Sequence, residues 1–139
     1  IQSRSQVKQL VADLQSHATT PLLIAIDYEG GQVNRLSEQN GFPPTVSPQS
    51  LGDTNNLRLT HQRATTMAKT LANLGINLNL APVVDVNTNP ENPVIGKRQR
   101  SFSKDPKIVS KHAIEYSVVL SIFQVTAVLA TIHTWASRM

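Results

Sequence analysis

The chain has 139 residues, of which 40% are hydrophobic and 16% charged, a composition that predicts one globular domain and excludes a disordered tail. It has no cysteine, which excludes disulfides, thiolate metal sites and a thiol nucleophile, and no apolar run of about 18 residues that would predict a membrane-spanning helix. The formal net charge is +4, but basic residues are dense only at 97–100 and aromatic residues are 4%, which disfavours nucleic-acid binding.

The first part of the chain predicts a helix followed by a strand. Apolar residues recur at helical spacing and indicate an amphipathic helix that ends near His17. They are Val7, Leu10, Val11 and Leu14. After Pro21, the apolar run 22–26 predicts a strand buried on both faces, as in a parallel sheet, and Asp27 follows it. Residues 28–53 are rich in Gly, Pro, Ser and Asn and predict a long loop without a core face.

A second helix and strand follow this loop. The apolar stripe of the helix consists of Leu57, Ala64, Met67, Ala68, Leu71 and Leu74. Gly75 stands where a left-handed residue would end that helix. Residues 76–86 predict an irregular strand or two short pieces, because Pro82 interrupts the run, and Asp85 lies near its end. A second polar loop extends from 87 to 104.

A third helix begins at Asp105 and Pro106, which suit an N-cap and a first helical turn. Its apolar stripe consists of Val109, Ala113, Tyr116, Leu120 and Phe123. Residues 125–129 then predict a last strand. Helix and strand alternate three times, which predicts an α/β fold with βαβ units around a parallel sheet. In such sheets the functional residues lie at the carboxyl ends of the strands, which form one rim of the sheet. Asp27 and Asp85 are expected at this rim.

The residues after the first strand form the first candidate site. Asp27 joins a buried strand to the pair Gly30-Gly31, where a carboxylate can accept hydrogen bonds from a polar ligand and the glycines allow close backbone approach. A capped turn explains these residues equally well. Arg35 is near enough in sequence to return to the same rim, whereas Glu29 is expected to point to the other face and need not share the site.

Metal binding is not favoured. Asp85, Asn87 and Asn89 offer oxygen atoms, but the stretch lacks the glycine and the terminal glutamate of a calcium loop, so an Asx-rich turn is preferred. The four histidines show no metal-ligand spacing and are interpreted as ordinary surface or helix residues. They are His17, His61, His112 and His133. The sequence therefore predicts neither a metal nor a cofactor.

Several short motifs, taken together, resemble one known family. They are IAIDYEGGQVNRL at 24–36, FP at 42–43, LGIN at 74–77, APVVDV at 81–86, NPVIG at 92–96 and RSFS at 100–103. In this order they resemble glycoside hydrolase family 3, in its β-N-acetylhexosaminidase branch, over about residues 1–129.

This resemblance implies a (β/α)₈ TIM-type barrel of about 250 residues, so the chain is expected to be a partial barrel, incomplete at both ends. Residues 1–129 would form the partial domain, and residues 130–139 an aberrant tail where the family carries Lys-His-Phe-Pro-Gly-His-Gly. A frameshift would explain the tail. If Thr134 is encoded ACC and Ala136 GCA, the next reading frame gives Pro-Gly-His.

The resemblance also implies retaining hydrolysis of terminal β-linked N-acetylhexosamine. In this branch an aspartate attacks the anomeric carbon, and a histidine oriented by an aspartate serves as acid and base. None of these three residues is identified here, so no catalytic residue is predicted and the chain is expected to be inactive alone. The matching positions belong to the sugar-holding side, with one supporting residue. They are Asp27 as acceptor, Arg35 and Arg100 as donors, and Asp85 as support for the rim, with Arg98 an extra basic neighbour.

Two other classes of function stay open. A non-catalytic remnant could bind a β-linked N-acetylglucosamine glycan or associate with itself, because a partial barrel exposes sheet edges and apolar surface. A nucleic-acid binder would depend on the basic run at 97–100 and would lose affinity steeply with salt.

Overall fold

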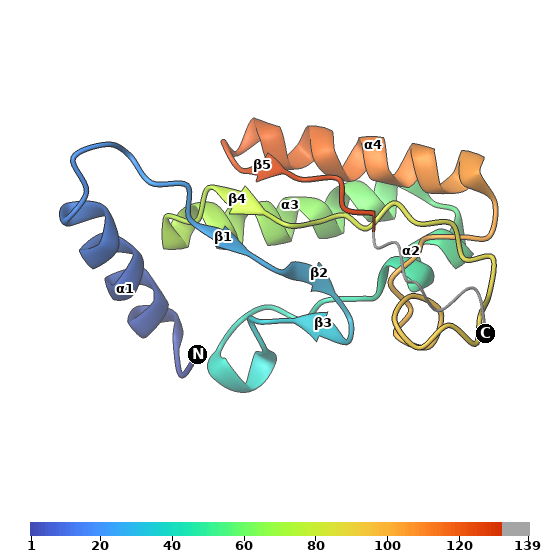
Figure 1. Ribbon diagram of the computed structural model, residues 1–139, viewed down its shortest axis with the longest axis horizontal. Helices are drawn as coiled ribbons and strands as arrows, with labels where there is room; N and C mark the ends of the chain where they lie inside the picture. Colours follow the sequence, from blue (N-terminus) through green and yellow to red (C-terminus); the bar gives the residue numbers. More distant parts are fainter. Residues whose placement is uncertain (132–139) are drawn as a thin grey trace.

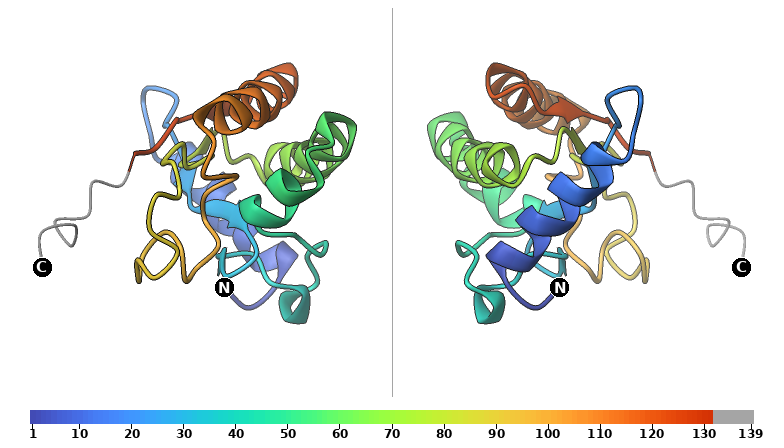
Figure 2. Two further views of the ribbon diagram at one scale, coloured as in Figure 1. Left: turned by 90° about the vertical axis from the view of Figure 1, so that its right-hand side faces the viewer. Right: turned by 90° about the vertical axis from the view of Figure 1, so that its left-hand side faces the viewer.

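The computed structural model describes residues 1–131 and shows a mixed α/β fold (Figures 1 and 2). In chain order the elements are α1 (Arg4–Ser16), β1 (Ala25–Ile26), β2 (Tyr28–Gly30), β3 (Val33–Asn34), the 3₁₀ turn η1 (Glu38–Asn40), α2 (Pro48–Thr54), α3 (Leu57–Leu74), β4 (Leu78–Asn79), α4 (Pro106–Ile122) and β5 (Thr126–Ala127). The predicted α/β class is confirmed. Within residues 1–131, no helix is long and apolar enough to cross a membrane. The predicted tail at 130–139 lies almost wholly outside the described residues.

A three-stranded parallel sheet forms the centre of the fold, in the order β1-β4-β5. Helices α3 and α4 pack side by side on one of its faces (Figures 1 and 2). Ile24 and Ile26 point toward these helices and pack on the core, whereas Leu23 is 74% exposed. The prediction that residues 22–26 are buried on both faces is therefore wrong, because alternate side chains face a side of the sheet that no described element covers.

The glycine-rich region 28–53 contributes to the core, contrary to the prediction that it has no core face. It folds into the antiparallel β2-β3 hairpin, η1 and α2. Tyr28, Leu36 and Phe42 from this region are buried with the apolar residues of α3 and α4. Their positions follow no helical or strand period, which is why the pattern did not indicate them.

The three predicted helices are confirmed, and so are two of their end signals. Gly75 ends α3 with a φ of 77°, and the Asp105 carboxylate caps α4 by accepting from the Lys107 N–H at 2.8 Å. In α1, by contrast, only half of the predicted stripe is buried, because Leu10 and Leu14 are exposed.

The predicted strand at 76–86 is split, as expected from Pro82. Its first piece is β4, and its second is a single parallel bridge between Val83 and Ala130. A cis peptide bond joins Ala81 to Pro82 between the two pieces. The chain then leaves the sheet toward Asp85.

His112 lies in α4, in agreement with its interpretation as a surface or helix residue, and it is fully buried. Its Nδ1 lies 2.7 Å from the Thr60 hydroxyl, and its ring stacks on Phe102 with a centroid distance of 5.3 Å. Burial lowers the pKa of this imidazole, so the neutral ring is favoured at neutral pH. His112 therefore links α3, α4 and the 101–103 segment as a packing residue. Residues 1–131 contain no group of three or more His, Cys, Asp or Glu side chains that could hold a metal ion.

Helix α2 makes an unusually close contact with the chain beside the rim. A Cβ atom on Gly52 would overlap the Phe102 carbonyl oxygen, so only glycine fits there. This contact fixes the chain two residues after Arg100 against α2.

We expect Gly52→Ala to lower the free energy of unfolding by more than about 1 kcal/mol, because overpacking outweighs the gain of about 1 kcal/mol that alanine brings to a helix. Urea unfolding followed by circular dichroism measures this change. Asp53→Ala, at an exposed position of the same helix, is the control and should change stability by no more than about 0.5 kcal/mol. Equal effects of the two variants would contradict the close contact.

Candidate functional site

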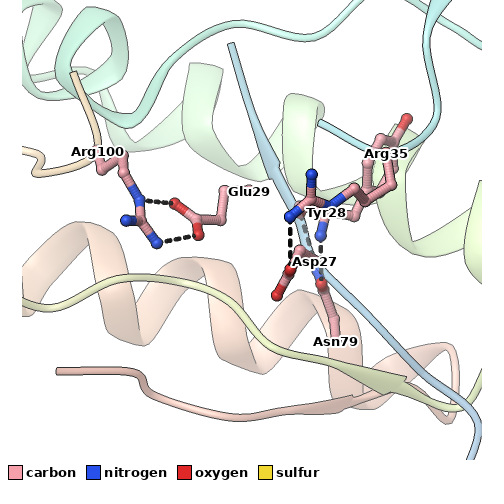
Figure 3. Close-up of polar contacts among 6 residues, drawn as sticks. All are labelled: Asp27, Tyr28, Glu29, Arg35, Asn79 and Arg100. Carbon is pink, nitrogen blue, oxygen red and sulfur yellow. Dashed lines mark hydrogen bonds and ion pairs between the residues drawn. The ribbon is translucent and has the colours of Figure 1, made fainter. Parts of the chain in front are cut away.

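Two ion pairs lie next to each other where β1 continues into β2, at the carboxyl end of the sheet (Figure 3). In the first pair, Arg35 Nη2 lies 3.2 Å from Asp27 Oδ2. In the second, Arg100 Nε and Nη2 donate to the two carboxylate oxygens of Glu29 at 2.9 and 2.6 Å. The structure thus brings three of the four predicted site residues to one rim, together with a carboxylate that was not predicted.

The Asp27–Arg35 pair is open to solvent. The aspartate side chain is 38% exposed and the arginine side chain 62% exposed. The β2-β3 hairpin returns Arg35 to the rim, and the Arg35 N–H also donates to the Asp27 carbonyl oxygen at 3.4 Å. Gly30 and Gly31 turn this hairpin with φ values of 98° and 61°. Polar atoms of the pair therefore stay accessible to a ligand.

The Glu29–Arg100 pair is buried, with side chains 2% and 14% exposed. Glu29 was not expected to be needed at the site, but it engages the predicted site residue Arg100 through both carboxylate oxygens. Residues two apart in an extended chain point to the same side, and this period could have grouped Glu29 with Asp27. Among the described residues, Arg100 Nη1 has no partner, which leaves one guanidinium nitrogen for a ligand.

A compact loop delivers Arg100 to Glu29. The Asn92 side chain accepts from the main-chain N–H groups of Val94 and Ile95, at 2.9 and 3.0 Å. The Arg100 N–H donates to the Ile95 carbonyl oxygen at 3.0 Å, which closes the loop. Arg98, the neighbouring basic residue, is exposed, so Arg100 is the arginine that points inward.

Asp85 reaches the same region through its main chain. Its carbonyl oxygen accepts from the Ser101 hydroxyl at 2.6 Å, and the Asn87 N–H donates to the Ser103 carbonyl oxygen at 2.9 Å. The chain after β4 thereby runs alongside the segment that follows Arg100. Asp85 is half-buried there.

Together these groups offer hydrogen-bond acceptors on Asp27 and donors on Arg35 and Arg100, within one rim. Carboxylates and guanidinium groups at fixed positions suit a ligand with several hydroxyl groups. The arrangement can therefore bind and orient a polyhydroxylated molecule.

Comparisons with known proteins converge on one family. The family model described as the glycosyl hydrolase family 3 N-terminal domain matches residues 2–133. Beta-hexosaminidase A from Pseudoalteromonas piscicida is 42% identical over 120 residues, which cover 80% of this chain and 19% of that protein. The beta-hexosaminidase of Photobacterium profundum is 36% identical over 114 residues, which cover 81% of this chain and 32% of that protein.

Solved structures show the same similarity. A glycoside hydrolase family 3 beta-N-acetylglucosaminidase from Paenibacillus sp. FPU-7 superposes with a TM-score of 0.86 at 36% identity, covering 92% of this chain and 24% of that one. The beta-N-acetylhexosaminidase from Beutenbergia cavernae gives 0.77 at 38% identity, covering 91% and 39%. The chain thus spans less than half the length of each of these four relatives.

We expect Glu29→Gln to lower the free energy of unfolding by about 3 kcal/mol or more, because it leaves the Arg100 charge buried without its partner. Asp27→Asn, in the exposed pair, serves as the matched control and should cost about 1 kcal/mol or less. Urea unfolding measures both. A double variant that also carries Arg100→Gln should cost less than the sum of its single changes, and strict additivity would argue against a coupled pair.

Proposed function

Because the chain belongs to glycoside hydrolase family 3, through the N-terminal domain of that family, we propose that it supplies the sugar-holding part of a retaining glycoside hydrolase. The proposed substrate is a glycan with a terminal β-linked N-acetylhexosamine. The observation that carries this proposal is the meeting of Asp27, Arg35 and Arg100 at one rim, although they come from two segments far apart in sequence.

Each residue has a proposed role at this rim. Asp27 accepts hydrogen bonds from hydroxyl groups of the sugar ring, and Arg35 donates to hydroxyl groups or to a ring substituent. Arg100 presents Nη1 to the sugar while Glu29 binds its other nitrogens. Asp85 supports the rim through the Ser101 contact.

The fold supports a second part of the proposal, that residues 1–129 form part of a (β/α)₈ barrel. Three parallel strands follow one another in the sheet, α3 precedes β4, and α4 connects β4 to β5. The proposed site lies at the carboxyl end of these strands, the face at which TIM-barrel enzymes bind their substrates.

On its own, the chain is proposed to bind the sugar without hydrolysing it. Asp27 and Glu29, the carboxylates of the two ion pairs, each engage a separate arginine (Figure 3). We assign Asp27 to holding the sugar and Glu29 to holding Arg100, and neither to attack on the anomeric carbon. Turnover then requires a nucleophile and an acid from outside this chain.

We expect N-acetylglucosamine to bind the 139-residue chain and Asp27→Ala to raise the dissociation constant about tenfold or more, because a charged hydrogen bond is worth about 1.5–3 kcal/mol. Titration followed by NMR measures this. Asp53→Ala removes an exposed carboxylate of α2 and should bind as the wild type does. Release of the aryl alcohol from an aryl N-acetylglucosaminide would disprove the assignment as non-hydrolytic.

A non-catalytic role in self-association has support of its own. Leu23 is exposed two residues before β1, and Ile114, Val118 and Ile122 are exposed along α4. Strands β1 and β5 each have a free edge among the described residues. Apolar surface and unpaired strand edges both favour association with a second chain, so we propose that the chain forms oligomers through them.

Light scattering after size exclusion should therefore give a mass above the 15.2 kDa of one chain, rising with concentration. Ile114→Lys places a charge on the apolar strip of α4 and should shift the equilibrium toward the monomer. Gln62→Lys adds the same charge at an exposed site of α3 and should leave it unchanged. A wild-type chain that is monomeric at all concentrations would disprove self-association.

A further inference from the structure

The main-chain ladder between β1 and β4 stops just before the rim. Its last pair is Ile26 with Asn79, and its last bond runs from the Leu80 N–H to the Ile26 carbonyl oxygen at 2.9 Å. The next residue but one, Tyr28, pairs with Asn34 in the hairpin instead. Tyr28 is thus the point at which the chain passes from the parallel sheet to the hairpin.

At this point a side chain replaces the missing main-chain partner. The Asn79 Oδ1 accepts from the Tyr28 N–H at 3.1 Å, and the Asn79 Nδ2 donates to the Tyr28 carbonyl oxygen at 3.1 Å (Figure 3). Asn79 is fully buried. A carboxamide suits this task because it offers a donor and an acceptor on one short planar group.

The hydroxyl of Tyr116 from α4 completes the contact. It donates to the Tyr28 carbonyl oxygen at 3.2 Å and accepts from the Asn79 Nδ2 at 3.3 Å. Burial raises the pKa of the Tyr116 phenol, so the hydroxyl keeps its proton at neutral pH. The side chains of Asn79 and Tyr116 are both buried, and hydrogen bonds are stronger in a buried environment than in water. They therefore hold the main chain of Tyr28 in place.

These bonds act on the two peptide units that carry the site carboxylates. The Tyr28 N–H belongs to the peptide unit shared with Asp27, whose carbonyl oxygen accepts from the Arg35 N–H. The Tyr28 carbonyl belongs to the peptide unit shared with Glu29. Fixing both units sets where the two carboxylates point.

We propose that Asn79 and Tyr116 are positioning residues of the sugar site, which fix both peptide groups of Tyr28 and so orient Asp27 and Glu29 toward their arginines. This inference rests on the proposed function, but the effect of Asn79 and Tyr116 on the Glu29–Arg100 pair can be tested without a sugar. Neither residue touches the ligand. Both act through the main chain of Tyr28.

The chain contains its own matched control. The Asn77 Oδ1 accepts from the Ile24 N–H at 2.7 Å, and its Nδ2 donates to the Leu22 carbonyl oxygen at 2.9 Å. Asn77 therefore makes two bonds of the same kind to the same stretch of chain, at the end away from the carboxylates. A general loss of strand pairing would affect Asn77 and Asn79 variants alike.

The experiment compares Asn79→Ala, Tyr116→Phe and Asn77→Ala in the full 139-residue chain. The first readout is solvent exchange of the Arg100 Nε–H in ¹⁵N NMR without ligand, which reports the Glu29 pair. The second is the dissociation constant for N-acetylglucosamine. We expect Asn79→Ala to accelerate the exchange and to weaken binding, each about tenfold, the factor that corresponds to ~1.4 kcal/mol. Tyr116→Phe should change both in the same direction by about threefold, equivalent to ~0.65 kcal/mol.

Asn77→Ala should leave the exchange rate and the dissociation constant within about twofold of the wild-type values, equivalent to ~0.4 kcal/mol. This should hold even if Asn77→Ala lowers the free energy of unfolding as much as Asn79→Ala does. Equal effects of Asn77→Ala and Asn79→Ala would overturn the proposal. If Asn79→Ala does not fold, Tyr116→Phe provides the test. An unchanged exchange rate of the Arg100 Nε–H in that variant would then overturn the proposal. A wild-type chain that fails to bind N-acetylglucosamine would disprove the proposed function alone, since the exchange measurement still decides the positioning role.

Discussion

The order of the rim depends on one buried ion pair, Glu29 with Arg100. Removing two charges from water costs several kcal/mol, and the attraction between them compensates only when the geometry is good and the remaining bonds are satisfied. Here the pairing is bidentate, and the loop behind Arg100 is closed by its own main-chain and Asn92 bonds. The loop and the pair therefore depend on each other, because an arginine on a loosely folded loop could not meet these conditions.

Packing against helices also fixes the segment that follows Arg100. Gly52 lets α2 contact the main chain at Phe102, and Phe102 in turn stacks on His112 of α4. The segment after Arg100 is thus enclosed between two helices. A rim made of loops is therefore held in place by contacts with the helices behind it.

The helices could be predicted from the sequence, because local signals suffice to identify them. The helical periods and the end signals at Gly75 and Asp105 identify α3 and α4, since propensity, capping and periodicity agree there. The exposure of Leu23 could not be predicted, because a pattern identifies apolar residues but not what covers them. The Glu29–Arg100 pair joins positions 71 residues apart, and it depends on a loop path that no period describes. Asp27 and Arg35 could be predicted from their places after the first strand, whereas Arg100 was found only through the family motifs, which carry information about distant parts of the chain.

The two ion pairs have a consequence for the kind of ligand that the rim admits. Each arginine faces one carboxylate, so the pairs contribute equal numbers of positive and negative charges. Salt screens the attraction between a charged surface and a charged ligand, but it has little to act on when both are neutral. The two balanced pairs select a ligand by the directions of their hydrogen bonds rather than by its charge, so binding of the proposed uncharged sugar is expected to be nearly independent of ionic strength.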